Sequence, residues 1–319
     1  MKKTLALLLA LVMVFSLCAC GKSAAAPTKL TYATGGTSGT YYGFSGVIAN
    51  VLNEKLKDTM NITVESTGAS KANVQMVDAG EADIAIVQND VMYYAYTGTD
   101  LFAGTAPITS FSAVASCYPE YVQILAKKDI TSVEQLAGKK VSVGDAGSGT
   151  EFNAKQILGA YGLDMDKDII KSNQSFADSA DSLKNGTIDA AFVVAGYPTT
   201  AVTELATSFD FNLLAIDDAH AAKLQSDYGF YYYGVIPGGT YSPVADDVPA
   251  VAVMATIIAS NKVSADVVYA FVKGLFDYKA DITAGHAKGN ELDLNTAVSG
   301  VSIPWHDGAA KFYKEQGLM

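Results

Sequence analysis

The sequence predicts an α/β fold with two parallel-sheet lobes and a ligand cleft between them. Two stretches of the chain follow the same order of strand, Ser/Thr/Gly turn, amphipathic helix, strand, helix and apolar strand. Their turns share one motif, Ser38-Gly39-Thr40 in the first stretch and Ser148-Gly149-Thr150 in the second. Because parallel strands need helical connections that cover the sheet, each stretch predicts one lobe.

In the first stretch, apolar residues alternate or run together in three segments and recur at helical spacing in two others. The predicted elements are a strand at 30–34, a turn at 35–40, a helix at 41–52, a strand at 62–66, a helix at 70–80 and a strand at 82–87. The last strand is almost wholly apolar, which is typical of a strand buried on both faces.

The second stretch repeats this plan. It predicts a strand at 140–143, a turn at 144–150, a helix that carries 154–161 and ends at Gly162, a strand at 169–172, a helix that ends at Gly186 and a strand at 188–194. A second motif also recurs, since Gly80-x-x-Asp83 and Gly186-x-x-Asp189 each precede a buried strand. Unrelated βαβαβ units can share such glycine caps, but two matches in order and at similar spacing favour two related lobes.

Two further segments are expected to link the lobes. An alternating segment at 121–126 predicts a strand that crosses to the second lobe, and 230–236 predicts a strand that returns. Residues beyond Pro237 read as mainly helical, with helices at 248–259, 265–278 and 308–316. The expected division is therefore lobe 1 at 29–121 and 236–319, and lobe 2 at 122–235.

The N-terminal residues predict export and lipid anchoring. Lys2 and Lys3 precede an apolar run too short to span a membrane, so residues 1–19 are expected to be a signal peptide. The segment Leu17-Cys18-Ala19-Cys20-Gly21 resembles a lipobox, which implies cleavage before Cys20 and its lipidation. Residues 20–28 would then be a tether, and the protein would lie at the outer face of the cytoplasmic membrane. An ordinary cleaved signal is the alternative.

Composition excludes some partners. The chain carries a net charge of −11, and loss of Lys2 and Lys3 would make it more negative. Such a protein repels nucleic acid, and it would contact a membrane only through its lipid anchor. With Cys20 lipidated, Cys117 has no disulfide partner in the mature chain. The Lys+Arg total consists of lysine alone, so a carboxylate ligand must be bound without a guanidinium group.

The two Ser-Gly-Thr turns are the leading candidates for a ligand site. Each follows a strand and opens a helix, so free backbone N–H groups and the positive end of the helix dipole would face the cleft. The candidates are Thr37, Ser38, Gly39, Thr40, Tyr41, Ser148, Gly149, Thr150 and Glu151. The serines could instead be ordinary helix caps, and Glu151 could either stabilise its helix or pair with a ligand ammonium.

Residues at the ends of the buried strands are candidates too. Gln88 and Asn89 follow the first apolar strand, where their amides could bind a ligand or simply end the strand. Gly196, Tyr197 and Pro198 follow the corresponding strand of the second lobe, and Tyr197 could cover the ligand or pack beside the proline.

Signals for catalysis are weak, and no cofactor is expected. The segment 144–150 approaches a P-loop but has Thr150 where the lysine would stand. His220, His286 and His306 lie far from both turns in sequence, and no cluster has metal-ligand spacing.

Several motifs together resemble the TAXI family of TRAP transporter solute receptors over essentially the whole mature chain. They are residues 35–42, 80–88, 118–120, 147–151, 196–200, 236–241 and 304–317. The resemblance implies a type II periplasmic-binding-protein fold, TRAP-type membrane permease subunits as partner, and a small carboxylate such as glutamate, glutamine or 2-oxoglutarate as ligand. The segment Ala69-Ser70-Lys71 departs from the family, where a second glycine is common.

Three other functions remain open from the sequence. The first is the substrate-binding lipoprotein of an ATP-driven importer, which would have the same fold and a different partner. The second is an enzyme on a two-lobed scaffold, although no catalytic cluster supports it. The third is a lipoprotein that senses a ligand and signals to a receptor.

Overall fold

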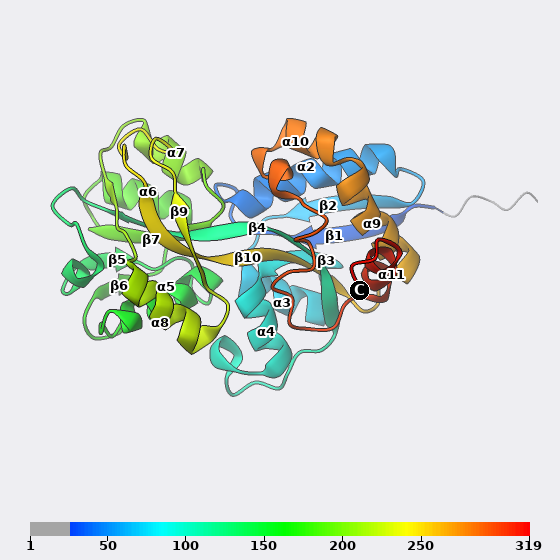
Figure 1. Cartoon of the computed structure of the whole chain (residues 1–319), viewed down its shortest axis with the longest axis horizontal. Helices are drawn as coiled ribbons and strands as arrows, with labels where there is room; N and C mark the ends of the chain where they lie inside the picture. Colours follow the sequence, from blue (N-terminus) through cyan, green and yellow to red (C-terminus); the bar gives the residue numbers. More distant parts are fainter. Residues whose placement is uncertain (1–25) are drawn as a thin grey trace, which may run out of the picture.

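The computed structural model describes residues 26–319. Within this range, ten strands form one mixed sheet that passes through both lobes, in the order β2-β1-β3-β10-β4-β7-β5-β6, with β8 beside β4 and β9 beside β10. Helices cover both faces of the sheet (Figure 1). The predictions on residues 1–19, Cys20 and most of the tether lie outside the described residues.

Lobe 1 is built on three parallel strands in the order β2-β1-β3. The chain runs through β1 (Thr28–Ala33), α2 (Thr40–Lys55), β2 (Met60–Glu65), α3 (Ser70–Ala79), β3 (Ile84–Gln88) and α4 (Asn89–Thr97). A short 3-10 helix, η1 (Asp100–Phe102), follows. All five residues of β3 are buried, as its apolar sequence predicts.

Lobe 2 repeats this arrangement with the order β6-β5-β7. Its unit is β5 (Lys140–Ser142), α5 (Gly149–Ala160), β6 (Ile170–Ser172), α6 (Phe176–Lys184) and β7 (Ala190–Ala195). The 3-10 helix η2 (Val133–Leu136) precedes it, and α7 (Thr200–Ala206), β8 (Asn212–Leu213) and α8 (Asp218–Tyr228) follow. The central strand of each lobe is therefore the one that precedes the Ser-Gly-Thr turn, which confirms the predicted repeat.

Two long antiparallel strands connect the lobes. They are β4 (Phe111–Ala126), whose last residues are the predicted crossing at 121–126, and β10 (Val248–Ser260). β10 pairs with β4 on one side and with β3 on the other, which makes the sheet mixed rather than purely parallel. In Figure 1 both strands run through the middle of the molecule.

The predicted helix at 248–259 is wrong, because this segment is strand β10. Its apolar run has no clear period and is rich in valine and isoleucine, so periodicity cannot separate a buried helix from a central strand. The predicted return strand at 230–236 exists as β9 (Tyr232–Ile236), but it pairs with the first half of β10. β10 itself therefore carries the chain back to lobe 1.

The C-terminal segment completes lobe 1. It contains α9 (Ala265–Asp277), α10 (Lys279–Gly285), the 3-10 helix η3 (Ala287–Glu291) and α11 (Asp307–Glu315). The helices predicted at 265–278 and 308–316 are thus confirmed. No helix in residues 26–319 has the length and apolar character needed to cross a membrane.

Each lobe has a buried core on both faces of the sheet. In lobe 1, one core joins Leu30 near the start of the chain to Tyr313 near its end, and the other lies under α3 and α4. The lobe 2 cores take side chains from Val122 to Val253. The return to lobe 1 therefore falls inside β10, where Ala255 and Ile257 join the first lobe 1 core, and not at the expected residue 236.

Candidate functional site: a pocket between the lobes

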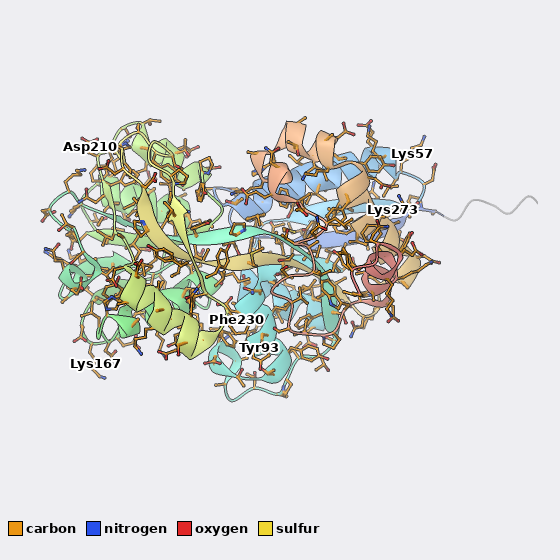
Figure 2. All side chains as sticks on the ribbon, viewed as in Figure 1. Lys57, Tyr93, Lys167, Asp210, Phe230 and Lys273 are labelled. Atoms are coloured by element: carbon orange, nitrogen blue, oxygen red, sulfur yellow. The ribbon has the colours of Figure 1, made fainter. Side chains whose placement is uncertain are left out.

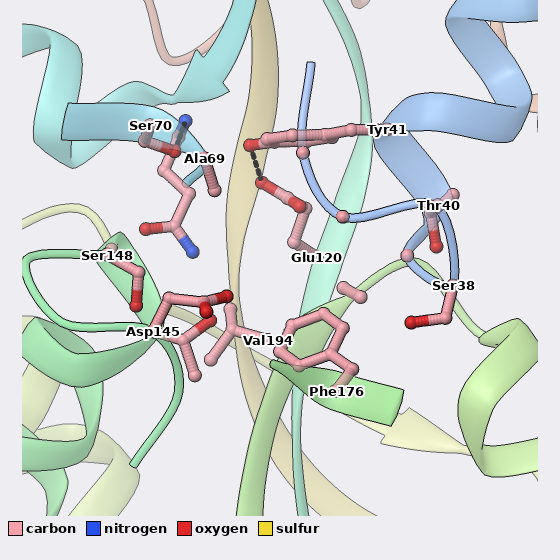
Figure 3. A pocket seen from close by; sticks show the side chains of 17 residues that line it. Ser38, Thr40, Tyr41, Ala69, Ser70, Glu120, Asp145, Ser148, Phe176 and Val194 are labelled. Atoms are coloured by element: carbon pink, nitrogen blue, oxygen red, sulfur yellow. Dashed lines mark hydrogen bonds between the residues drawn. The ribbon is translucent and has the colours of Figure 1, made fainter. Parts of the chain in front are cut away.

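A pocket lies between the lobes where the central strands end and helices α2 and α5 begin (Figure 3). Open α/β sheets bind ligands at this edge. Its lining residues are Gly35, Gly36, Ser38, Gly39, Thr40, Tyr41, Ala69, Ser70, Gln88, Glu120, Asp145, Ser148, Gly149, Thr150, Phe176, Val194 and Ala195. Both lobes contribute to it, so its shape depends on how they sit together.

The lobe 1 turn leaves its serine hydroxyl available. Gly39 is the N-cap of α2, has extended backbone angles and gives no side-chain cap. Its own N–H donates to Gly36 O over 2.9 Å, which tightens the turn. Ser38 is therefore not the helix cap, and its side chain lines the pocket in Figure 3.

In the lobe 2 turn, the serine also caps the helix. Ser148 Oγ accepts a hydrogen bond from Glu151 N over 3.1 Å, and Glu151 Oε2 accepts one from Gly147 N over 2.6 Å. This reciprocal pattern resembles a capping box. Gly144 and Gly147 have φ values of +91° and +75°, which favour glycine in this turn. Ser148 still lines the pocket, and its O–H hydrogen is free to donate.

Both helix starts can bind an anionic group. The first N–H groups of a helix have no partner within it, and the dipole makes this end positive. The N-termini of α2 and α5 enter the same pocket from opposite lobes, with the hydroxyls of Ser38, Thr40, Ser148 and Thr150 beside them. The arrangement supplies hydrogen-bond donors from two sides.

A buried carboxyl group, Glu120 of β4, also faces this pocket. Only 2% of the residue is exposed, and Tyr41 donates its phenolic hydrogen to Glu120 Oε2 over 2.7 Å. Figure 3 shows this bond at the pocket wall. Burial raises the pKa of Glu120 well above its usual value, while the Tyr41 bond opposes that shift. Burial and the nearby Glu120 raise the pKa of Tyr41, which keeps it a donor.

Asp145 brings a second carboxyl group from lobe 2. It lies in the turn before α5, and its side chain points toward the pocket in Figure 3. Burial and the charge of Asp178 raise the pKa of Asp145. Among the lining residues there is no lysine or histidine, so neither carboxyl group meets a cation there.

The lobes approach each other closely at Gly149. A Cβ atom at this position would lie 1.7 Å from Gln88 Oε1 and 3.1 Å from Val91 Cγ2. Gln88 is 3% exposed, and its Oε1 is buried without a hydrogen-bond partner among the described residues. Its backbone N–H donates to Ser70 Oγ over 3.1 Å.

Hydrogen bonds between the lobes hold the pocket closed. Thr40 Oγ1 donates to Gly196 O over 2.8 Å, and Ala201 N donates to Ser38 O over 3.2 Å. On the α4–α5 side, Asn153 Nδ2 donates to Asp90 Oδ2 over 2.8 Å.

Aromatic rings support the same interface. Phe230, which follows α8, packs against Tyr93 and Tyr94 of α4 at centroid distances of 5.3 and 5.5 Å. Tyr93 and Phe230 lie close together where the lobes meet in Figure 2.

Eight of the candidates from the sequence line the pocket. They are Ser38, Gly39, Thr40, Tyr41, Gln88, Ser148, Gly149 and Thr150. The structure thus brings together both turns and one of the strand-end amides, and their contact with a ligand stays a prediction.

Six candidates lie outside the lining: Thr37, Asn89, Glu151, Gly196, Tyr197 and Pro198. Asn89 accepts from Met254 N and donates to Gly300 O, so its amide links α4 to neighbouring segments. Glu151 stabilises its own turn and lies 3.5 Å from Lys171 Nζ.

Two of the other four residues form part of the lobe contact. Gly196 accepts the Thr40 bond, and Tyr197 packs against Tyr121 and lies 4.8 Å from Lys288 Nζ. Pro198 follows Tyr197 through a cis peptide bond.

Four further residues line the pocket that were not predicted from the sequence: Ser70, Glu120, Asp145 and Phe176. Glu120 had a usable signal, since it is the one charged residue in the strand Phe111–Ala126. Asp145 and Phe176 resemble ordinary loop and helix-start residues, and only the folded structure places them at the pocket. In residues 26–319 no group of three or more His, Cys, Asp or Glu side chains could hold a metal ion.

Comparison with known proteins places the chain in a family. The model of the NMT1-like family matches residues 32–317. The chain belongs to the NMT1-like family. The TAXI resemblance of this NMT1-like protein stays a prediction, because the matching model is a different one.

Solved structures share the fold of this NMT1-like protein at low sequence identity. The alkanesulfonate-binding protein SsuA from Xanthomonas axonopodis pv. citri, bound to MOPS, has a TM-score of 0.51 and 17% identity over 91% of this chain and 84% of that chain. The periplasmic aliphatic sulphonate binding protein SsuA from Escherichia coli has a TM-score of 0.52 and 16% identity over 91% and 83%.

A third structure, from work on glutathione import via GshT and the cystine ABC importer TcyBC of Streptococcus mutans, has a TM-score of 0.53 and 12% identity over 84% and 98%. These likenesses confirm the predicted α/β fold with two lobes.

Proposed function

We propose that this NMT1-like protein is a solute-binding protein that captures a small polar solute between its lobes and delivers it to a membrane transporter. One observation carries the proposal: two helix starts from different lobes open into one pocket, and interlobe hydrogen bonds close that pocket. Such a site binds by closure of two rigid bodies around a ligand. No covalent chemistry is proposed, because the lining offers hydroxyl, amide and carboxyl groups without a histidine or cysteine.

For the ligand, we propose a solute with a carboxylate or another small anionic group. The support is the set of backbone N–H groups at the starts of α2 and α5 together with the hydroxyls of Ser38, Ser148 and Thr150. These donors replace the arginine that the chain lacks. A glutamate-like, glutamine-like or 2-oxoglutarate-like solute is the specific class that the sequence motifs imply.

For the transporter, an ATP-driven importer is the better supported partner. The similar structure from Streptococcus mutans is described with a cystine ABC importer, and one from Listeria monocytogenes (TM-score 0.50, 14% identity) as a putative L-cystine ABC transporter. A TRAP-type permease driven by an ion gradient is the second candidate, and it rests on the sequence motifs alone. Uptake into membrane vesicles that contain the cognate transporter separates the two: ATP-dependent uptake supports the importer, whereas uptake driven by an imposed ion gradient supports the permease.

For location, we propose that a lipid on Cys20 holds the protein at the outer face of the cytoplasmic membrane. Changing Cys20→Ser should release it into the medium or the soluble extracellular fraction. Fractionation and blotting test this, and a variant that stays in the membrane fraction with its signal removed contradicts the anchor.

The test of solute binding is direct. Mass spectrometry of small molecules released from the purified protein should find a bound polar solute, and titration calorimetry should then give saturable binding with one site per chain. Conversion of that solute into a product by the purified protein would contradict a pure binding role.

A further inference from the structure

The acidic groups of the pocket have no cation opposite them. More than nine-tenths of Glu120 is buried, and its Oε1 accepts no hydrogen bond from any residue in 26–319. Asp145 lies on the lobe 2 side of the same pocket (Figure 3). A buried carboxylate without a positive partner is costly, and the half-buried Asp145 adds a second acidic group, so the pocket suits a ligand that neutralises charge.

The groups around Glu120 come from several elements, and none of them neutralises it. On α2, Tyr41 donates a hydrogen bond, and on α4 the negative Asp90 raises the pKa of Glu120. The nearby cation, Lys288 of η3, lowers the pKa of Glu120 but makes its direct contacts elsewhere, since its Nζ lies 2.5 Å from Glu291 Oε1 and over the rings of Tyr118 and Tyr197. Tyr118 of β4 brings only a phenol.

We propose that the solute carries a positively charged nitrogen, an ammonium group, which binds between Glu120 and Asp145 while its anionic group binds the two helix starts. The inference rests on the proposed function and narrows its ligand to zwitterionic solutes. A dicarboxylate without nitrogen would place a second negative charge beside these carboxyl groups, so the site excludes it.

Protonation follows from this geometry. Burial, and after it the charge of Asp90, raise the pKa of Glu120 in the empty pocket, whereas the Tyr41 hydrogen bond and the charge of Lys288 act in the opposite direction. An ammonium group beside it favours the ionised form and lowers the pKa. Binding therefore releases a proton, and affinity increases as the pH rises toward the pKa of the empty site.

The first experiment uses matched probes. Titration calorimetry is carried out with common amino acids and, separately, with the 2-oxo acid or desamino acid that corresponds to each. Binding should occur only when the ammonium group is present. Equal binding by a probe without nitrogen overturns the inference and leaves the proposed function in place. No binding by any probe, together with no solute recovered by mass spectrometry, contradicts the proposed function itself.

The second experiment uses Glu120→Gln, which keeps the shape of the side chain and an oxygen to accept from Tyr41. Binding of the amino acid probe should weaken about tenfold to hundredfold, because one charge-assisted contact is lost. Titrations in buffers of different ionisation enthalpy should show proton release in the unmodified protein and none in the variant.

Asp178→Asn is the matched control. This residue is exposed and outside the pocket lining, yet close enough to affect Asp145. The substitution removes one negative charge from the same region. The affinity should change by less than about threefold, because physiological salt screens an exposed charge. If both substitutions weakened the affinity equally, the cause would be the overall negative charge of the region, and the direct contact between Glu120 and the ammonium group would be overturned. Circular dichroism verifies that both variants fold.

Discussion

At residue 149 the backbone of lobe 2 lies directly against a side chain of lobe 1. The Cβ that any other residue would add lies 1.7 Å from Gln88 Oε1 and 2.6 Å from its Cδ. Gln88 is buried, so its side chain must shift to accept a larger residue at position 149, and Val91 Cγ2 at 3.1 Å limits the space as well. The closed arrangement of the lobes, and not a positive φ, therefore favours glycine here.

Gly149→Ala should weaken solute binding about tenfold or more, because the closed form must separate to accept the methyl group. Gly159→Ala is the control, since it lies in the same helix and a Cβ there meets nothing within 4 Å. The control should keep full affinity and gain up to about 1 kcal/mol of helix stability. Calorimetry and thermal unfolding measure both variants, and unchanged affinity in Gly149→Ala would contradict the tight approach.

Asp90 is a second residue that lies where the two lobes meet. It is fully buried between α4 and α5, and burial raises its pKa to about 6 despite hydrogen bonds from Asn153 and Val91. A carboxyl group with a folded pKa above its unfolded value stabilises the fold at low pH. That contribution is lost as the pH rises through about 6.

Asp90→Asn should remove this loss. The amide oxygen can still accept from Val91 N, and its NH2 group can donate to Asn153 Oδ1, which has no partner among the described residues, if the Asn153 amide turns. The free energy of unfolding at pH 8 should then increase by up to about 3 kcal/mol, and it should change little at pH 4. Urea titrations at the two pH values check this, with the exposed Asp58→Asn as control. A variant that is less stable than the parent at pH 8 would contradict the buried-charge argument.

At the scale of elements, the starts of α2 and α5 are alike in sequence and different in capping. Ser148 caps α5, whereas α2 begins without a side-chain cap and leaves Ser38 free. Another serine of lobe 2, Ser175, caps α6 in the same way as Ser148 and does not line the pocket. Comparing these two serines therefore distinguishes a role in helix stability, which both have, from a role in binding, which only Ser148 can have.

Ser148→Ala and Ser175→Ala should each cost about 1 kcal/mol of stability through the lost cap. Only Ser148→Ala should also weaken binding, by about one factor of ten, because its hydroxyl faces the ligand. Thermal unfolding and calorimetry on the pair measure the two effects. Equal affinity in both variants would make Ser148 a structural cap alone.

The sequence predicts some of these elements and not others. The repeated strand-turn-helix units were predictable, because helical periodicity and glycine turns are local signals. β10 was not, since Val248–Ser260 is mostly apolar with no clear period, and its strand state comes from pairing with β3 and β4.

The same limit applies to the pocket. Ser38 and Ser148 could be selected from a motif, but Asp145 and Phe176 reach the pocket only because lobe 2 folds over lobe 1.

At the scale of the whole molecule, closure is the expected motion. The lobes are joined through β4 and β10, and the remaining contacts between them are side-chain contacts and hydrogen bonds such as Thr40 to Gly196. Rigid lobes joined by two strands open by bending those strands.

X-ray scattering should therefore show a smaller radius of gyration when saturating solute is present. The variant Gly149→Ala should stay in the larger form under the same conditions, while Gly159→Ala should compact like the parent. Identical profiles with and without solute in the parent would contradict a closing pocket.

The path of the chain has a consequence for biosynthesis. The lobe 2 cores are complete once residue 253 has been synthesised, because their side chains run from Val122 to Val253. The lobe 1 core joins Leu30 to Phe312 and Tyr313, so it cannot close until residue 313 has been synthesised. Until then a nascent chain carries an unfinished lobe 1, with its apolar strands still free for a chaperone.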